Sequence, residues 1–375
     1  MNAPDRDTTT MRRALALARR GLGRVEPNPM VGAVVVRDGR IVGEGYHRRF
    51  GGPHAEVVAL EAAGPDARGA ELFVTLEPCC HHGKTPPCTE AIVAAGVRRV
   101  VAAAEDPFPE VAGRGLARLR EAGLRVTVGV LEEEARRLNA AFFKRTRTGR
   151  PLVIAKWAMT LDGRLADASG TSRWISGEAS RRRVHEVRRI CDAVLVGSGT
   201  ALADAPSLTV RHAAPLPERG QPTRVILDGR LRLPPGAEPA ASARQVPVIV
   251  YTLQDAPADT AGRADDLRRA GCEVVPMPEG PGGVDLGAVL DDLGRRDASR
   301  ALVEGGGRVL GSLLAQGLAD RVMVFVAPRL LAAGDARSPL DGPAGRALAD
   351  AVDLQDVTVE RVGEDVLIEG RVGEF

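Results

Sequence analysis

The sequence has few aromatic residues, little excess charge of either sign and no long apolar run. Phe, Trp and Tyr make up only 3% of the 375 residues, and the net charge is +2. Proteins that bind nucleic acid usually present a basic surface and stacking aromatics, so this composition argues against such a partner. No apolar run approaches about 18 residues, and arginines interrupt the apolar positions of residues 1–23. We therefore expect no membrane span and no signal peptide, and an amphipathic first helix instead.

Cysteine and lysine are also scarce, which makes the positions of the few informative. Three of the five cysteines fall between residues 79 and 88. This clustering favours metal binding or catalysis in a reducing, cytosolic compartment over a disulfide scaffold. The only lysines among the 51 basic residues are Lys84, Lys144 and Lys156. In a chain that otherwise uses arginine, a lysine weakly marks a position that needs a compact ammonium group.

The length and the order of strand and helix signals predict two domains, each an α/β structure in which helices cover a sheet. We expect the boundary in the charged segment 132–150, which gives domains of residues 1–146 and 150–375. In the first half, the Asp38-Gly39 pair between two β-rich runs predicts a hairpin over residues 31–46.

The remaining elements are expected from periodicity and from Pro and Gly positions. Strands are expected over residues 71–76, 98–103, 125–130, 152–156, 193–196, 224–228, 246–251, 300–303 and 321–326. Helices are expected over residues 54–63, 111–122, 178–189, 263–270, 286–295 and 308–316, with another that opens at residues 85–87. The Pro- and Ala-rich segment 231–244 is expected to be a loop.

One imidazole and two thiols in the first half form a pattern typical of catalytic zinc. His54-Ala-Glu56 stands at the start of an expected helix, Cys79 follows a strand, and Cys88 opens another helix. Such a set leaves the fourth position of tetrahedral zinc open to water, whose pKa the metal lowers. A carboxylate two residues beyond the His ligand can then carry the proton. A His and two Cys on zinc, with a Glu that is not a ligand, characterise zinc-dependent nucleobase deaminases.

The spacing leaves the choice of thiolates open. Eight residues separate Cys79 from Cys88, and they include three further possible ligands, Cys80, His81 and His82. We choose Cys79 and Cys88 because each follows a proline at a turn into a helix, where thiolate is favoured. The alternatives to a catalytic site are a structural zinc clip and reactive cysteines without metal.

Four segments of the first half resemble the bifunctional deaminase–reductases of riboflavin biosynthesis. The segments are Asn28-Pro-Met-Val-Gly32, Gly43-Glu-Gly-Tyr-His47, Pro53-His-Ala-Glu56 and the run from Thr75 to Cys88 with its long insert. The resemblance implies a cytidine-deaminase-like αβα domain and the hydrolytic deamination of 2,5-diamino-6-ribosylamino-4(3H)-pyrimidinone 5′-phosphate. It also implies that Asn28 shapes the pyrimidine pocket and that Lys84 meets the substrate phosphate. Cys80 stands where the family usually has Ser.

The second half contains a triple glycine, Gly305-Gly-Gly307, between an expected strand and an expected helix. Bare glycine backbone lets a pyrophosphate approach a helix N-terminus. The run is not G-x-G-x-x-G, which argues against a Rossmann domain. A turn that binds nothing is the alternative.

Further segments of the second half resemble the reductase half of the same family, which has a dihydrofolate-reductase-like α/β fold. They are 156–164, 172–175, 196–200, Asp204 and 206–211. The resemblance implies reduction of the ribosylamino group to ribitylamino by NADPH. The implied NADPH contacts are Ala158, Trp174, Thr200, Asp204, Gly306, Gly307, Arg308, Val309, Leu310, Gly311 and Ser312. Where the family usually has a second Asp after Asp204, this chain has Ala205.

The resemblance also implies substrate contacts in the second half, namely Ser172, Arg188, Leu208, Arg211 and Glu304. Arginine can hold a phosphate through two hydrogen bonds, and a carboxylate at a strand end can accept from ribose hydroxyls. We add Lys156, whose ammonium could polarise the sugar or bind phosphate. From charge alone, Arg230 or Arg232 could approach the 2′-phosphate of NADPH.

The sequence therefore predicts a cytosolic two-domain enzyme that uses Zn²⁺ and NADPH on a small pyrimidine ribotide, with neither nucleic acid nor membrane as partner. The resemblance further implies a homo-oligomer. The rival hypotheses are a deaminase of nucleic-acid or nucleoside bases, and a C-terminal domain that binds without catalysis.

Overall fold

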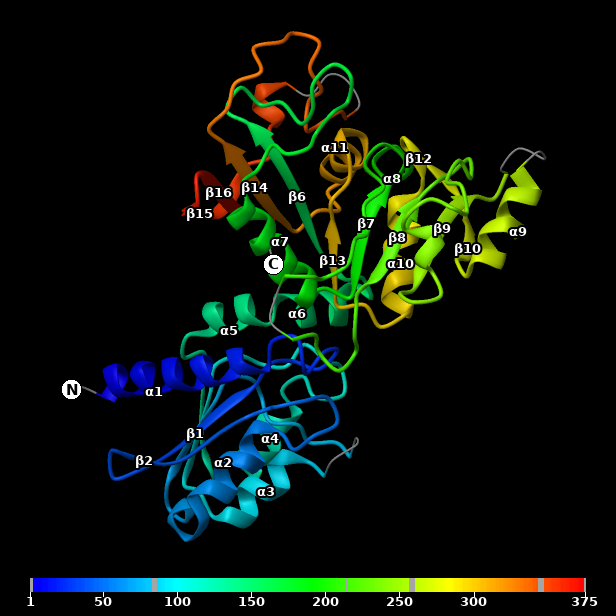
Figure 1. The fold of residues 1–375 in the computed structure, drawn as a ribbon. Helices are drawn as coiled ribbons and strands as arrows, with labels where there is room; N and C mark the ends of the chain where they lie inside the picture. Colours follow the sequence, from blue (N-terminus) through cyan, green and yellow to red (C-terminus); the bar gives the residue numbers. More distant parts are fainter. Residues whose placement is uncertain (1–2, 83–85, 213–214, 256–259, 343–346, 374–375) are drawn as a thin grey trace. The chain divides into compact units, whose positions relative to one another are not determined.

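Two large β-sheets organise the chain, one in each of two units that comprise Met1–Thr148 and Gly149–Glu374, and unit 2 also contains a small two-stranded sheet (Figure 1). The computed structural model describes residues 3–82, 86–212, 215–255, 260–342 and 347–373. Within these residues, no helix is both long and apolar enough to cross a membrane. Each unit is described by itself below.

Unit 1 alternates helices and strands after an N-terminal helix. Its α-helices are α1 (Ala3–Ala18), α2 (Ala55–Ala63), α3 (Cys88–Ala95), α4 (Arg114–Glu121), α5 (Glu132–Leu138) and α6 (Ala140–Thr148). Its strands are β1 (Gly32–Arg37), β2 (Arg40–Tyr46), β3 (Glu71–Val74), β4 (Arg99–Ala102) and β5 (Arg125–Val128). Two short 3-10 helices are η1 (Arg19–Gly21) and η2 (Gly64–Ala67).

The sheet of unit 1 has the order β2-β1-β3-β4-β5, and helices cover both of its faces. Successive residues of β1 point to opposite faces, with Val35 in the cluster under α2, α3 and α4 and Val34 in the cluster under α1, α5 and α6. β1 pairs with β2 in an antiparallel hairpin whose turn residues Asp38 and Gly39 both have positive φ. The predicted hairpin and the predicted αβα layering are therefore confirmed.

Two glycines of β2 set the position of α2 on the sheet. A Cβ atom on Gly43 would lie 2.2 Å from the carbonyl oxygen of Ala59, and one on Gly45 would lie 2.4 Å from that of Ala55. Only glycine allows helix and strand to approach so closely. Because α2 begins directly after His54, this contact also fixes where His54 and Glu56 stand.

Unit 2 is a longer α/β series. Its strands are β6 (Leu152–Thr160), β7 (Ala193–Gly197), β8 (Thr223–Leu227), β9 (Val248–Leu253), β10 (Glu273–Met277), β11 (Glu279–Gly280), β12 (Gly283–Val284), β13 (Arg300–Val303), β14 (Arg321–Ala327), β15 (Leu354–Val362) and β16 (Asp365–Val372). Its helices are α7 (Glu178–Ile190), α8 (Ser198–Asp204), α9 (Ala261–Ala270), α10 (Leu286–Arg295) and α11 (Gly307–Ala315), with 3-10 turns η3 (Ala240–Ser242) and η5 (Leu348–Asp350).

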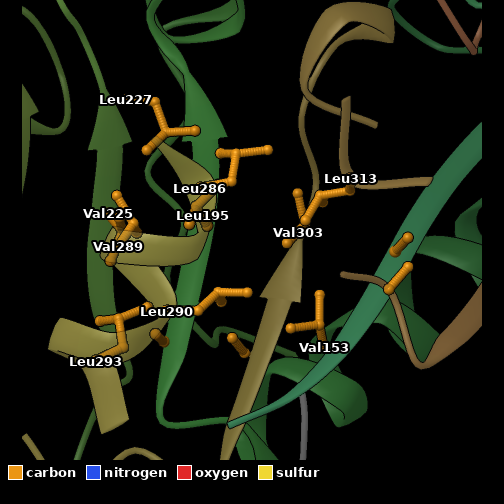
Figure 2. Close-up of a cluster of buried hydrophobic side chains, with 14 of the residues drawn as sticks. Val153, Leu195, Val225, Leu227, Leu286, Val289, Leu290, Leu293, Val303 and Leu313 are labelled. Atoms are coloured by element: carbon orange, nitrogen blue, oxygen red, sulfur yellow. The ribbon is translucent and has the colours of Figure 1, made fainter. Parts of the chain in front are cut away.

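The large sheet of unit 2 has the order β10-β9-β8-β7-β13-β6-β14-β16-β15. The strands from β10 to β14 run parallel, and β16 and β15 add an antiparallel edge. Figure 2 shows side chains of α10, such as Leu290 and Leu293, packed against Val225 and Leu195 of the sheet. The opposite face carries a second cluster that includes Leu267 of α9. Both faces are covered, as parallel sheets require.

Candidate functional site

The three predicted zinc ligands of unit 1 converge from three separate segments. His54 caps the N-terminus of α2, Cys88 is the first residue of α3, and Cys79 lies in the loop that follows β3. His54 Nδ1 lies 3.1 Å from Cys88 Sγ and 3.5 Å from Cys79 Sγ. One ligand atom from each residue lies within 4.8 Å of the other two.

These separations fit a zinc ion. Ligand atoms at about 2.0–2.3 Å from a tetrahedral zinc stand about 3.3–3.8 Å from one another, close to the 3.1 and 3.5 Å found here. The rival ligands lie elsewhere: Cys80 Sγ points to the carbonyl of Glu110 at 3.8 Å, and the ring of His81 packs against Phe108. His82 Nε2 lies 3.9 Å from Glu90 on the exposed side of α3. The geometry therefore favours Cys79 and Cys88 among the thiolates and imidazoles that the sequence left open.

The local electrostatics suit a cation bound to thiolate. Hydrogen bonding to Cys88 lowers the pKa of Cys79 to about 4 and raises the pKa of the Cys88 thiol, so the pair readily holds one negative charge. The backbone N–H of Cys88, at the start of α3, also donates to Cys79 Sγ at 3.3 Å. The Glu56 carboxyl is buried in the first turn of α2, and this burial raises its pKa. A raised pKa suits a group that must both accept and release a proton.

Sequence reasoning missed two buried polar residues of unit 1, one next to His54 and one that binds the chain before β1. His47 is buried, its ring meets that of His54 edge to face at 5.4 Å, and its Nδ1 lies 3.0 Å from the carbonyl of Pro53. Asn139 is buried and holds Met30 through both its amide oxygen (2.8 Å to N) and its amide nitrogen (2.9 Å to O). The signal for His47 was its place in the Gly43–His47 motif. Asn139 gave none, because 109 residues separate it from its partner.

Of the two predicted substrate residues of unit 1, only Asn28 lies within the described residues. Asn28 lies in the turn before β1, where its N–H donates to the carbonyl of Val25 at 2.9 Å. The pair between Asn139 and Met30 fixes the end of this turn. Lys84 lies outside the described residues.

Unit 2 contains a cavity of about 1030 Å³ at the carboxyl ends of its parallel strands. The walls come from the segments that follow β7, β8 and β13, as is usual for ligand sites on parallel sheets. The predicted residues that line the cavity are Ser172, Thr200, Asp204, Glu304, Gly306, Gly307, Arg308, Val309 and Ser312. Further lining residues, which the sequence suggested only from charge, are Arg230 and Arg232.

The cavity fits a dinucleotide with phosphates. Gly306 caps the N-terminus of α11 without a side-chain cap, so the first backbone N–H groups of the helix are left for a ligand. A Cβ atom on Gly306 would stand 3.2 Å from Thr200 Oγ1, so the glycine keeps this wall open. Arg230 and Arg232 add positive charge at the same cavity.

A charged cluster joins three of the predicted substrate residues. Arg188 donates from Nε and Nη2 to the two carboxylate oxygens of Glu304, at 2.5 and 3.1 Å, and Lys156 Nζ lies 3.7 Å from the same carboxylate. Burial alone would raise the pKa of Glu304, but the charges of Arg188 and Lys156 lower it to about 2. Burial lowers the pKa of Lys156. Glu304 thus stays ionised beside an ammonium group that releases its proton more easily than usual.

The remaining predicted residues of unit 2 are not among those that line the cavity. The Trp174 ring is exposed and has Arg181 4.6 Å from its centroid, and Arg211 donates its backbone N–H to His185 Nδ1 at 3.3 Å. Side chains that are buried in, or packed against, apolar clusters are those of Ala158, Leu208 and Leu310. Gly311 lies against Gly342, where a Cβ atom would come within 2.5 Å of its nitrogen.

Two family profiles together match most of the chain. The profile described as "Cytidine and deoxycytidylate deaminase zinc-binding region" matches residues 4–104. The profile described as "RibD C-terminal domain" matches residues 151–368. The first match contains His54, Cys79 and Cys88, and the second contains every residue predicted for the reductase site.

Relatives and solved structures match nearly the whole length. The "Riboflavin biosynthesis protein RibD" of Aquifex aeolicus (strain VF5) is 43% identical over 362 residues, which is 96% of this chain and 97% of the relative. The structure "Acinetobacter baumannii RibD, form 1" has a TM-score of 0.86 at 37% identity and covers 99% of this chain and 100% of the other. The structure of a diaminohydroxyphosphoribosylaminopyrimidine deaminase/5-amino-6-(5-phosphoribosylamino)uracil reductase from Thermotoga maritima has a TM-score of 0.83 at 39% identity, with the same coverage.

Proposed function

The chain belongs to the RibD family of riboflavin-biosynthesis proteins, and from that premise we propose how its residues divide two consecutive reactions. It is a bifunctional enzyme with a deaminase and a reductase domain, and its cofactors are Zn²⁺ and NADPH. We assign the deaminase to residues 1–146 and the reductase to residues 150–375. The observation that carries this assignment is the division of the two sites between the units, with the His54, Cys79 and Cys88 group in unit 1 and the glycine-lined cavity in unit 2.

In the first reaction, 2,5-diamino-6-ribosylamino-4(3H)-pyrimidinone 5′-phosphate loses its 2-amino group to water. Bound zinc supplies a Lewis acid that lowers the pKa of water toward neutrality. His54, Cys79 and Cys88 hold the metal. The Glu56 carboxylate takes the two protons of the attacking water in turn, passing the first to a ring nitrogen of the pyrimidine and the second to the amino group, which leaves as ammonia. Burial favours this role, because the carboxyl exchanges the proton in a site that bulk water does not reach.

In the second reaction, the ribosylamino group becomes ribitylamino. Bound NADPH supplies the hydride, which reaches C1 of the sugar. Backbone N–H groups at the start of α11 bind the pyrophosphate, and Glu304 accepts hydrogen bonds from sugar hydroxyls. Lys156 holds a proton next to Glu304 and can donate it where the sugar ring opens. The lowered pKa of this lysine supports such a donation.

The experiment is a coupled assay of the full chain with the diaminopyrimidine ribotide. Ammonia release and NADPH oxidation are followed separately. We expect ammonia release without NADPH, and NADPH oxidation only after deamination has supplied the uracil ribotide. Deamination of single-stranded DNA or tRNA, together with none of the ribotide, would contradict the proposed substrate.

For partners, we propose a homo-oligomer that forms through the free edge of the large sheet. β15 is the edge strand, and its side chains are almost all exposed, among them Val357 at 51% and Val359 at 68%. A long exposed edge strand with apolar residues normally pairs with another strand, and a second copy is the partner that symmetry favours. Light scattering of wild type and Val359→Lys tests this, and a wild-type monomer would contradict it.

The thiolate site also needs a reducing environment, so we place the protein in the cytosol.

A further inference from the structure

Glu77 is a buried carboxylate two residues before Cys79, and it is not one of the three zinc ligands. It is only 3% exposed. Its Oε1 accepts the backbone N–H groups of Gly115 (2.9 Å) and Leu116 (3.1 Å), and its Oε2 accepts those of Gly113 (2.9 Å) and Asp106 (3.1 Å). Each oxygen thus has two N–H donors. A buried carboxylate with four donors is held in one orientation.

Three of these donors belong to the N-terminus of α4. Gly113 caps this helix but makes no side-chain capping bond, since glycine has no side chain. Glu77 supplies the missing cap from a different segment, and its negative charge meets the positive end of the helix dipole. The same helix turn touches the chain next to Cys79, because a Cβ atom on Gly115 would lie only 2.0 Å from the carbonyl oxygen of Pro78.

A second contact from α4 holds the other side of Cys79. Arg118, one turn further along α4, donates from Nη1 to the carbonyl oxygen of Cys80 at 3.2 Å. Its Nη2 donates to Glu90 on α3 at 3.1 Å, so the same side chain also ties α4 to the helix that begins with Cys88. Cys79 is therefore flanked by one anchor before it and one after it, both made by the first turns of α4.

We propose that Glu77 is a positioning residue of the metal centre, which fixes the Cys79 thiolate at the distance from His54 and Cys88 that zinc requires. Pro78 transmits the position, because its ring fixes φ between Glu77 and Cys79. The Arg118 bond to Cys80 is the weaker, solvent-exposed part of the same brace, which comprises Glu77, Arg118 and the α4 N-terminus. This inference rests on the proposed zinc site.

The test replaces Glu77 by Gln in the full chain. An amide of the same shape keeps two acceptor contacts but turns an N–H₂ group toward two N–H donors, so two of the four bonds are lost. Groups that orient metal ligands typically change metal affinity or activity by 10–100-fold when mutated, so we expect zinc release to a chromogenic chelator to be about tenfold faster. The matched control is Glu121→Gln, an exposed carboxylate at the other end of α4.

Three further readouts separate positioning from general stability. In the cobalt-substituted protein, Glu77→Gln should change the thiolate-to-cobalt charge-transfer bands. The kcat of deamination should fall while the KM of the ribotide changes little. NADPH oxidation by unit 2, supplied with the deaminated uracil ribotide, should stay at the wild-type rate. Wild-type zinc release and an unchanged cobalt spectrum in Glu77→Gln, with only a lower melting temperature, would overturn the proposal.

If Glu77→Gln does not fold, the rate of zinc release from Arg118→Met tests the proposal instead. Arg118 is half exposed, and its loss should speed zinc release by a smaller, measurable factor, whereas a rate equal to that of wild type would overturn the brace. A wild-type chain that binds no zinc and releases no ammonia would contradict the proposed function itself, and the brace with it. The wild-type arm therefore distinguishes failure of the function from failure of this inference.

Discussion

The two units build their sites in opposite ways. Unit 1 gathers a few strong ligands, His54, Cys79 and Cys88, at the starts of two helices and in one loop. Unit 2 spreads its cavity over many positions, from Leu165 to Asp341, around the carboxyl ends of parallel strands. A metal needs particular atom types, which a sequence displays directly. A dinucleotide needs a shape and free backbone N–H groups, which many sequences can provide. The chemistry of unit 1 can therefore be read from residue types, and that of unit 2 mainly from resemblance.

The largest expected effect is a loss of deamination while the reductase activity stays unchanged. Glu56→Gln removes the proton carrier but leaves the ligands in place. We expect deamination to fall by about 10²–10⁴-fold, which is the usual contribution of general acid–base catalysis. Zinc content by atomic emission and NADPH oxidation with the uracil ribotide should match wild type. Glu61→Gln, an exposed position on the same helix, is the control. Equal deamination in Glu56→Gln would remove Glu56 from the mechanism.

In unit 1, sequence reasoning located the chemistry but missed its supports. The hairpin followed from Asp38-Gly39, and the metal group followed from the spacing of His54, Cys79 and Cys88. The sequence did not reveal Glu77 or Asn139, because both act on backbone groups that are distant along the chain. Backbone N–H groups have no residue identity, so no motif marks their acceptors. The charged segment 132–150, in which a domain boundary was expected, forms α5 and α6 over most of its length, and no helix was expected there.

In unit 2, buried strands and helices of the parallel region were predicted, and the antiparallel edge of the large sheet was missed. Residues 300–303 and 286–295 match β13 and α10, because apolar periodicity marks a buried strand and an amphipathic helix. The strands β15 and β16 were not predicted. Most of the side chains of β15 are exposed on both faces, so it lacks the alternation of a half-buried strand. The short helix α8 was read as part of a motif, since its glycine- and serine-containing start has low helix propensity.

The second prediction concerns the folding stability of unit 2, in which the buried charges of Arg188 and Glu304 neutralise each other. Arg188→Met leaves Glu304 beside a single ammonium group, and breaking a buried pair typically costs about 3–5 kcal/mol. Both side chains of the pair are 11% exposed. Both tryptophans, Trp157 and Trp174, lie in unit 2, so tryptophan fluorescence, excited selectively over tyrosine, reports the urea unfolding of this unit alone.

The control for that measurement is Arg182→Met on the same helix. Its ion pair with Glu178 is solvent-exposed and should contribute little. If Arg188→Met and Arg182→Met lowered the free energy of unfolding equally, the buried cluster would have no special role in unit 2.

The third prediction identifies which arginine of the cofactor site binds the 2′-phosphate of NADPH. Arg230 and Arg232 both line the cavity, and Arg232 Nη2 already donates to Ser198 Oγ at 2.7 Å. A charged hydrogen bond to phosphate contributes about 1.5–3 kcal/mol, so loss of the relevant arginine should raise the KM for NADPH by about 10–100-fold. NADH lacks the 2′-phosphate, and its KM should not change. The single variants Arg230→Gln and Arg232→Gln identify the residue, and no change in either would place the 2′-phosphate elsewhere.

The smallest expected effect is a dependence of the stability of unit 2 on pH. Burial, together with the charges of Arg188 and Arg211, lowers the pKa of His185 from 6.5 to about 4. The folded unit thus keeps this imidazole neutral where the unfolded chain would bind a proton. The free energy of unfolding should therefore fall as the pH decreases from about 6.5 to about 4.

Glu304 contributes in a lower window, because a carboxyl whose pKa is lowered to about 2 loses its stabilising charge only as the pH falls from its ordinary range to that value. His185→Gln should therefore flatten the tryptophan-monitored stability curve above pH 4 and leave the loss below pH 4 intact. His212→Gln, which removes the ring 5.4 Å from His185, should keep most of the slope. If His185→Gln retained the full slope, the proton uptake on unfolding would belong to another group of unit 2.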